Sequence, residues 1–279
     1  MLRTLVQFTL WNLFLLSCGT RFCLGQEFLQ GRVLSSIDSI PLTYVNIGVL
    51  GKAIGTASDT TGYFTLTLNS QLQSDSIRVS MIGFKSKTLL ASEFKKLLEK
   101  EQQRIYLEPD IVQMDAVHIS NKKLQRRTLG NTSKSRSYTI GFASNHLGNA
   151  LGLRIKIKKP TRILAFHTYV VKNTYPRAKF RLNIYAMHAS IPGASLLKEN
   201  ILVETTLKEG PLTIDLRPYN IYVGQDILLA LEWIEDLGVH DLQFSAALFG
   251  NPAFFRSASQ DVWEKSSTFT LGFSIDVEQ

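Results

Sequence analysis

The sequence predicts an all-β protein built from two β-sandwich domains. Short apolar runs separated by turn residues recur in both halves of the chain, and many alternate apolar and polar residues with the two-residue period of a half-buried strand. Phe64, Leu66 and Leu68, for example, alternate with threonines. A basic and polar stretch between the two halves marks a domain boundary.

The first half contains seven candidate strands and one short helix. The helix is expected near 91–101, where apolar residues share one face. Asp59 and Gly62 enclose a tight turn, because an aspartate side chain accepts hydrogen bonds from the following backbone and glycine tolerates a positive φ. We therefore assign both residues a structural role. The expected strands are 28–34, 44–49, 55–58, 63–68, 76–81, 85–90 and 104–107.

The second half is predicted to be a jelly-roll-like β-sandwich of about nine strands without a helix. Alternation in 151–157 and 180–186 is typical of strands with one buried face. The run 227–234 carries apolar residues on both faces, which indicates a more central strand.

The N-terminal segment, 1–25, has the features of a secretory signal peptide. Arg3 gives a positive start, 5–16 is mostly apolar, and small residues stand three and one positions before a cleavage point between Gly25 and Gln26. The apolar run is shorter than the roughly 20 residues that a membrane-spanning helix needs. We therefore expect an exported chain, in the periplasm or associated with an outer membrane, without a transmembrane segment after processing.

Both cysteines, Cys18 and Cys23, fall inside this leader. The processed chain would contain neither a disulfide nor a thiol nucleophile. Residues 15–18 also resemble a bacterial lipobox, so the alternative is a lipoprotein anchored at Cys18.

Of the formal net charge of +8, six units lie in one segment, 116–136, and two lie in the leader. A nucleic-acid-binding domain presents a basic face on a folded surface, so we expect no nucleic-acid partner. Residues 120–137 are predicted to be a basic linker between a domain at 26–119 and a domain at 138–279. The segment contains no acid and holds Lys122, Lys123, Arg126, Arg127, Lys134 and Arg136.

Several motifs of the first half form one recognisable pattern, at 31–33, 41–47, 55–56, 59–64, 75–77, 80–84, 105–109 and 114–117. With these motifs, residues 27–119 resemble the carboxypeptidase regulatory-like family, a seven-stranded sandwich of transthyretin/Ig-like shape. The resemblance implies that these residues form turns, bulges and core contacts and are not catalytic. It also implies an exported protein of Gram-negative bacteria, in which an uncharacterised β domain follows the module. Such modules often precede the plug of outer-membrane receptors, but about 140 further residues cannot form a barrel of that size.

The sequence contains no motif typical of an enzyme, a metal site or a cofactor site. The five histidines are scattered and none belongs to an H-E-x-x-H motif, and no G-x-S-x-G elbow is present. We therefore expect no enzymatic activity, no metal and no cofactor. The alternative is a hydrolase whose histidine and carboxylate groups converge only in space. The histidines are His118, His146, His167, His188 and His240.

Trp263 and Phe255 are the candidate ligand-binding residues. Aromatic side chains beside polar groups can stack on sugar rings, and packing at the sandwich edge is the competing interpretation. The predicted function is an exported, non-enzymatic cell-envelope protein with one structural or interaction module and a second, binding domain. Its partner would be an envelope protein or a glycan of unknown identity. The alternative function is a carbohydrate-binding or adhesion module.

Overall fold

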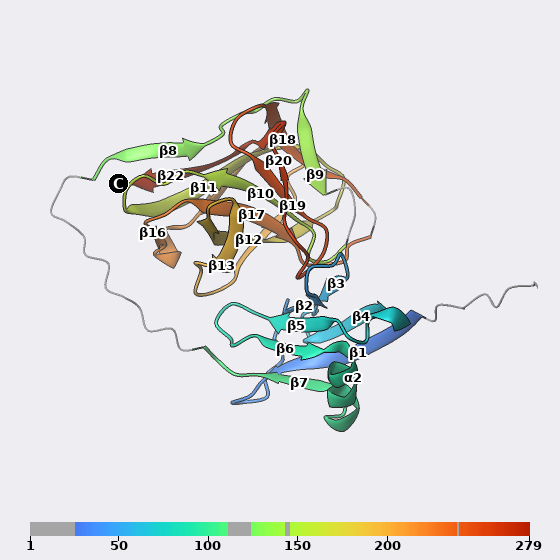
Figure 1. Cartoon of the computed structure of the whole chain (residues 1–279). Coiled ribbons are helices and arrows are strands. Elements are labelled where there is room, and N and C mark those ends of the chain that lie inside the picture. The colour runs from blue at the N-terminus through green and yellow to red at the C-terminus, as the bar shows by residue number, and fades with distance from the viewer. Residues whose placement is uncertain (1–25, 111–123, 143–145, 239) are drawn as a thin grey trace, which may run out of the picture.

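The computed structural model describes residues 26–110, 124–142, 146–238 and 240–279. Within them the chain folds into two β-sandwich domains that lie side by side (Figure 1). The predicted signal peptide lies outside the described residues, with its cleavage site after Gly25 and the alternative anchor at Cys18. Gln26 is the first described residue and already belongs to a strand.

The N-terminal domain is the predicted seven-stranded sandwich. Its first sheet has the strand order β4 (Tyr63–Asn69), β1 (Gln26–Ser35), β7 (Arg104–Leu107). Its second sheet has the order β3 (Gly55–Ala57), β2 (Asn46–Val49), β5 (Ser76–Ser80), β6 (Lys87–Leu90). A short 3-10 helix, η1 (Ser70–Leu72), follows β4.

The predicted helix is α2 (Ala91–Lys100). It turns Phe94 and Leu98 into the core, where the Phe94 ring lies 6.3 Å from the ring of Phe64. Glu93 accepts a hydrogen bond from the backbone N–H of Leu90 and so satisfies a free donor at the start of the helix.

The C-terminal domain is a sandwich of two larger sheets. The first has the order β13 (Ile191–Ser195), β12 (Ala178–His188), β17 (Ile227–Trp233), β10 (Ala150–Ile155), β19 (Ala253–Arg256), β20 (Glu264–Ser266), and β14 (Ile201–Thr205) also pairs with β12. The second has the order β21 (Phe269–Leu271), β18 (Leu242–Leu248), β11 (Thr161–Asn173), β22 (Phe273–Glu278), β8 (Arg126–Gly130). Three short strands extend the second sheet: β15 (Gly210–Asp215) and β16 (Tyr222–Val223) pair with β11, and β9 (Thr139–Phe142) pairs with β18. A 3-10 turn, η2 (Arg217–Tyr219), links β15 to β16.

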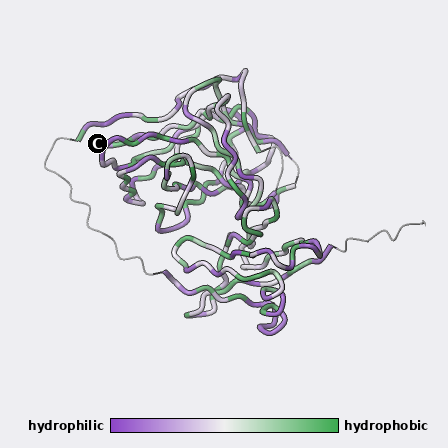
Figure 2. The backbone as a smooth tube through the Cα atoms, viewed as in Figure 1, coloured by the Kyte–Doolittle hydropathy of each residue, from purple (hydrophilic) through white to green (hydrophobic). Residues whose placement is uncertain are grey.

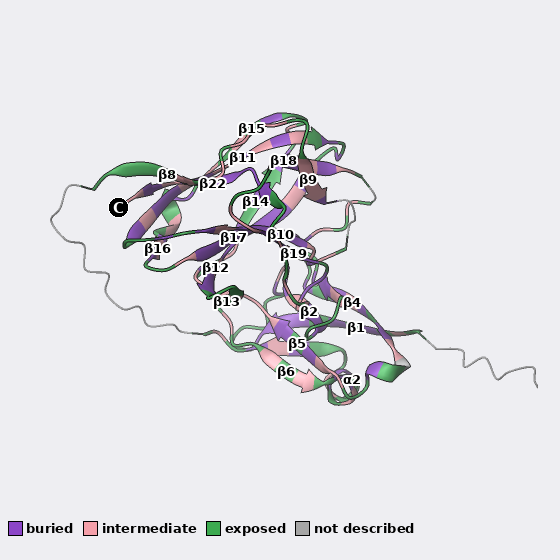
Figure 3. Cartoon of the chain, turned by 45° about the horizontal axis from the view of Figure 1, so that its top comes forward, coloured by how far each residue is buried: buried purple, intermediate pink, exposed green. Residues whose placement is uncertain are grey.

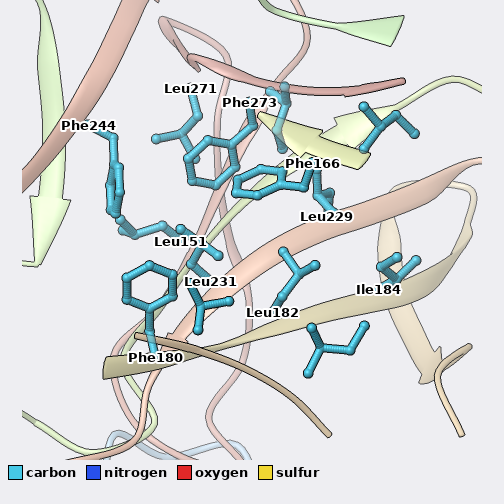
Figure 4. Close-up of a cluster of buried hydrophobic side chains, with 14 of the residues drawn as sticks. Leu151, Phe166, Phe180, Leu182, Ile184, Leu229, Leu231, Phe244, Leu271 and Phe273 are labelled. Carbon is cyan, nitrogen blue, oxygen red and sulfur yellow. The ribbon is translucent and has the colours of Figure 1, made fainter. Parts of the chain in front are cut away.

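An apolar core fills the space between these two sheets (Figure 4). β12 contributes Phe180 and Leu182, β17 contributes Leu229 and Leu231, and the facing sheet contributes phenylalanines. Apolar and polar residues alternate along many strands (Figure 2), as expected when only one face of a sheet contacts the core. Each fully buried side chain of this size contributes roughly 1.5–3 kcal/mol to the stability of the fold.

Strand β8 lies where the sequence predicts a linker, so the boundary of the second domain at 138 is wrong. Residues 126–130 pair antiparallel with β22, and Leu129 packs against the core. Figure 3 shows β8 exposed along most of its length. Its positive charge is accommodated because acidic residues of β22 lie opposite, as in the ion pair of Arg126 with Glu278 at 3.1 Å.

The turn between β3 and β4 is built from Asp59 and Gly62. Asp59 Oδ1 accepts hydrogen bonds from the backbone N–H of Thr61 at 2.7 Å and of Tyr63 at 3.0 Å. Gly62 has a φ of 76°. A Cβ atom at this position would lie 2.7 Å from the carbonyl oxygen of Val33.

We expect Gly62→Val to destabilise the chain by about 1–3 kcal/mol, because a β-branched residue is strained at positive φ and its Cβ would meet Val33. Chemical unfolding followed by circular dichroism measures the change. Gly224→Val is the matched control, because Gly224 is exposed and a Cβ there would meet nothing within 4 Å. Equal unfolding midpoints for the two variants would contradict this role of the turn.

Candidate functional site

The two domains meet where the second sheet of the N-terminal domain faces the loop between β19 and β20 (Figure 1). The backbone N–H of Gly51 donates to the carbonyl of Gln260 at 3.0 Å, and Gln260 Nε2 donates to Ser80 Oγ at 2.7 Å. Ser259 Oγ donates to Asn46 Oδ1 at 3.2 Å. These contacts join residues far apart in the sequence and fix one domain against the other.

Two glycines of the N-terminal domain allow this close approach. A Cβ atom on Gly48 or on Gly55 would overlap the carbonyl oxygen of Ser259. The backbone of the C-terminal loop therefore lies directly on the backbone of β2 and β3, which only glycine permits. Gln260, with a φ of 67°, is held in a left-handed conformation at the same contact.

The contact continues into a buried cluster of charged side chains centred on Arg181, which is 2% exposed. Arg181 Nη1 donates to the carbonyl of Tyr44 at 2.9 Å, and Nη2 donates to Asn46 Oδ1 at 2.8 Å. Both acceptors belong to the other domain. Within its own domain, Arg181 Nε donates to Glu232 Oε2 at 3.0 Å.

Glu232 is fully buried and lies between two guanidinium groups. It accepts from Asn183 Nδ2 at 2.7 Å and from Arg256 Nη2 at 2.8 Å, in addition to Arg181. Burial opposes ionisation, but the two arginines outweigh it and hold the pKa of Glu232 below its ordinary value of 4.5. The stabilisation from this carboxylate is therefore present above pH 4.5 and is lost as the pH falls through its lowered pKa.

The structure separates the two aromatic residues that the sequence indicates as ligand candidates. Trp263 is half-buried on the outer face of the first sheet, with the Arg256 guanidinium 5.0 Å from its ring centre and the Tyr185 ring at 5.8 Å. Phe255 packs instead against the core between the sheets. The two side chains therefore form no common surface on which a sugar ring could stack.

Arg181→Met should destabilise the chain by about 3–5 kcal/mol, because it removes one member of a buried ion cluster and leaves acceptors of both domains unpaired. The free energy of unfolding in denaturant measures this loss. Arg217→Met is the control, because Arg217 is an exposed residue paired with Asp215, and such pairs contribute about 1 kcal/mol or less. Similar losses in both variants would show that the cluster does not stabilise the fold.

Gly55→Ala should weaken the contact between the domains and leave each sandwich folded, because the three atoms nearest to the added Cβ all belong to Ser259 of the other domain. We expect a larger radius of gyration in small-angle X-ray scattering and two unfolding transitions in place of one. Gly224→Ala serves as the control. An unchanged radius of gyration would mean that the contact between the domains accommodates the added methyl group, and it would contradict this prediction.

A polar groove of about 420 Å³ lies on the outer face of the second sheet of the C-terminal domain. Three of its lining residues belong to a row of side chains that also includes His167, which does not itself line the groove. His167 Nδ1 lies 2.9 Å from Thr213 Oγ1, and Thr128 Oγ1 donates to Asp276 Oδ1 at 2.7 Å. His167 Nε2 lies 3.0 Å from Asp276 Oδ2, but the contact is poorly aligned for a hydrogen bond. The residues that line the groove are Arg126, Arg127, Thr128, Leu164, Ala165, Thr213, Asp215, Arg217 and Asp276.

Most charges of the groove are paired. The hydrogen bond from Thr128 lowers the pKa of Asp276 against the opposing effect of burial, with a further contribution from His167. Two hydrogen bonds from Arg217 lower the pKa of Asp215 to about 2. Arg127 differs, because within the described ranges its guanidinium donates to the neutral Gln125, at 3.0 Å, and to no carboxylate. The groove therefore holds a positive charge that no described acidic residue neutralises.

The other described histidines do not join this row. His146 and His188 are exposed, and the ring of His240 lies 5.0 Å from that of Tyr175. His118 lies outside the described residues. In the described part of the chain, no three His, Cys, Asp or Glu side chains are grouped so that they could hold a metal ion.

Comparison with known proteins identifies the first domain. Residues 29–119 match the family model of the CarboxypepD_reg-like domain, so the N-terminal sandwich belongs to this domain family. None of the curated proteins matches the sequence. Among the described residues, no helix is long and apolar enough to cross a membrane.

The chain also has a distant likeness to solved viral structures. They are the T13 particle of infectious bursal disease virus (10% identity, 91% of this chain and 76% of that chain, TM-score 0.27), its Gx strain (8%, 91% and 71%, 0.25) and its VP2 subviral particle (8%, 91% and 71%, 0.19). These TM-scores are too low to support a common fold.

Proposed function

We propose that this chain is an exported, non-enzymatic binding protein of the cell envelope, in which the polar groove of the C-terminal sandwich holds the ligand. The regulatory-like domain serves as the structural module that is fixed to the opposite side of that sandwich. The observation that carries the proposal is the groove itself, where side chains with both donors and acceptors project from a rigid sheet. Rigid strands place such groups more precisely than loops do.

The chemistry of the groove favours an acidic, hydroxyl-bearing ligand such as an oligosaccharide with carboxylate groups. Arg127 supplies a guanidinium that has no acidic partner in the part of the chain that the structure describes, and guanidinium groups bind carboxylates in a two-pronged geometry. Thr128 and Thr213 add hydroxyl groups that can bond to a sugar. The carbohydrate-binding alternative therefore rests on this groove and no longer on Trp263 and Phe255.

A hydrolase is the second candidate, because Thr213, His167 and Asp276 have the hydroxyl, imidazole and carboxylate order of a catalytic triad. Two features of the geometry disfavour it. The His167–Asp276 contact is poorly aligned, and the backbone N–H groups of β11, β15 and β22 serve the pairing of the strands, so few are free to stabilise an oxyanion.

We expect the purified protein to bind oligogalacturonate more tightly than a neutral maltooligosaccharide of equal length in calorimetric titration. Arg127→Gln should weaken the binding of the acidic sugar about tenfold, the effect of losing about 1.4 kcal/mol. Lys96→Gln, which removes an exposed charge from α2 of the other domain, is the control and should leave binding unchanged.

Equal affinity for both sugars, or equal binding by Arg127→Gln and the native protein, would refute the proposal that the groove binds an acidic sugar. The same preparations test the second candidate. Hydrolysis of p-nitrophenyl acetate should proceed at the same rate with the native protein and with His167→Ala. A rate that falls strongly in His167→Ala would establish the hydrolase in place of the binding protein.

A further inference from the structure

The end of the C-terminal sandwich carries an exposed apolar tip, formed by Leu248, Phe249 and Phe269. Their side chains are 38%, 74% and 39% exposed. Leu248 and Phe269 are partners across the β18–β21 pair, and the backbone N–H of Phe249 donates to the carbonyl of Thr268 at 2.9 Å. Strand pairing therefore holds the tip in a fixed shape.

Phe249 occupies a conformation that is unfavourable for its residue type. Its φ is 57°, in the left-handed region that glycine and asparagine enter most readily. A ring that is largely exposed gains little burial in return. Strained residues that gain little within the folded chain are typical of functional contacts, and an exposed ring at this position suits a contact with another surface.

The stretches of chain that form the tip contain no charged residue. Residues 242–255 and 266–275 contain no Asp, Glu, Lys or Arg. Beside β18 lies Tyr138, which is 44% exposed and whose carbonyl accepts from the N–H of Ala246. Lys134 follows Ser133, whose hydroxyl donates to the carbonyl of Ala246 at 3.2 Å. Lys134 is exposed and has no ion-pair partner among the described residues.

These properties fit a lipid surface better than a protein partner. A stable protein interface buries about 800 Å² on each side, which three side chains at the end of the β18–β21 pair cannot supply. A bilayer accepts a small apolar projection, while tyrosine and lysine side chains suit the level of its headgroups. Anionic headgroups also attract an unpaired lysine. We propose that the tip inserts into the surface of an anionic lipid bilayer, a contact separate from the ligand groove.

The test is co-sedimentation of the mature protein, beginning at Gln26, with phosphatidylcholine vesicles that contain or lack phosphatidylglycerol. The native protein should bind the anionic vesicles, and Phe249→Asn should lower the partition coefficient about tenfold because it removes the ring that is buried in the bilayer. Asparagine tolerates the positive φ, so the melting temperature should not fall and the loss cannot be assigned to unfolding. Lys134→Gln should weaken binding to the anionic vesicles only, and less so at high salt.

Phe28→Asn is the matched control, because Phe28 is another exposed phenylalanine, 60% accessible, on β1 of the N-terminal domain. It should bind as the native protein does. Phe249→Trp should bind and shift its fluorescence to shorter wavelength on the vesicles. The proposal is overturned if the native protein does not bind anionic vesicles, or if Phe249→Asn binds them as tightly as the native protein does. It is also overturned if Phe249 crosslinks to a protein and added vesicles do not reduce that crosslinking.

Discussion

The arrangement of the two domains depends on a carboxylate that has no access to water. Removing Glu232 from water is unfavourable unless charged donors surround it, and Arg181 and Arg256 supply those donors. Arg181 in turn donates to Asn200 of its own domain and to the carbonyl of Tyr44 and the amide oxygen of Asn46 in the other domain. The hydrogen bonds that this buried guanidinium needs are thus supplied in part by the other sandwich.

This dependence accounts for local features that would otherwise be unfavourable. Tyr44 and Gln260 both have left-handed backbone conformations, and both present a carbonyl oxygen to the opposite domain. Gly48 and Gly55 leave their strands without side chains so that Ser259 can approach. Residues with positive φ and glycines are concentrated at this interface because the polar contacts there require the two backbones to lie very close together.

The sequence predicts the sandwiches well because burial imposes a regular period on long strands. The alternation in 63–68 and 180–186 and the apolar run 227–234 all lead to the right strands. Shorter edge strands such as β8 and β20 bury too few residues to show a period, so the second domain has more strands than the expected nine or so. The sequence does not predict the interface, because Arg181 occupies a position that alternation assigns to solvent. One signal does point to it: Glu232 is an acid inside an otherwise apolar run, and it pairs across the sheet with Arg181.

In each domain, the first strand pairs with the last strand. In the N-terminal domain the first strand, β1, pairs with the last, β7, and in the C-terminal domain β8 pairs with β22. Neither first strand can complete its sheet until the last residues of its domain have emerged, and such long-range pairing slows folding. During synthesis, an N-terminal sandwich completed at Leu107 must wait, with its glycine-lined face uncovered, until Arg181 and Ser259 have been made and folded. The growing chain is therefore most exposed to proteases and to aggregation in that interval.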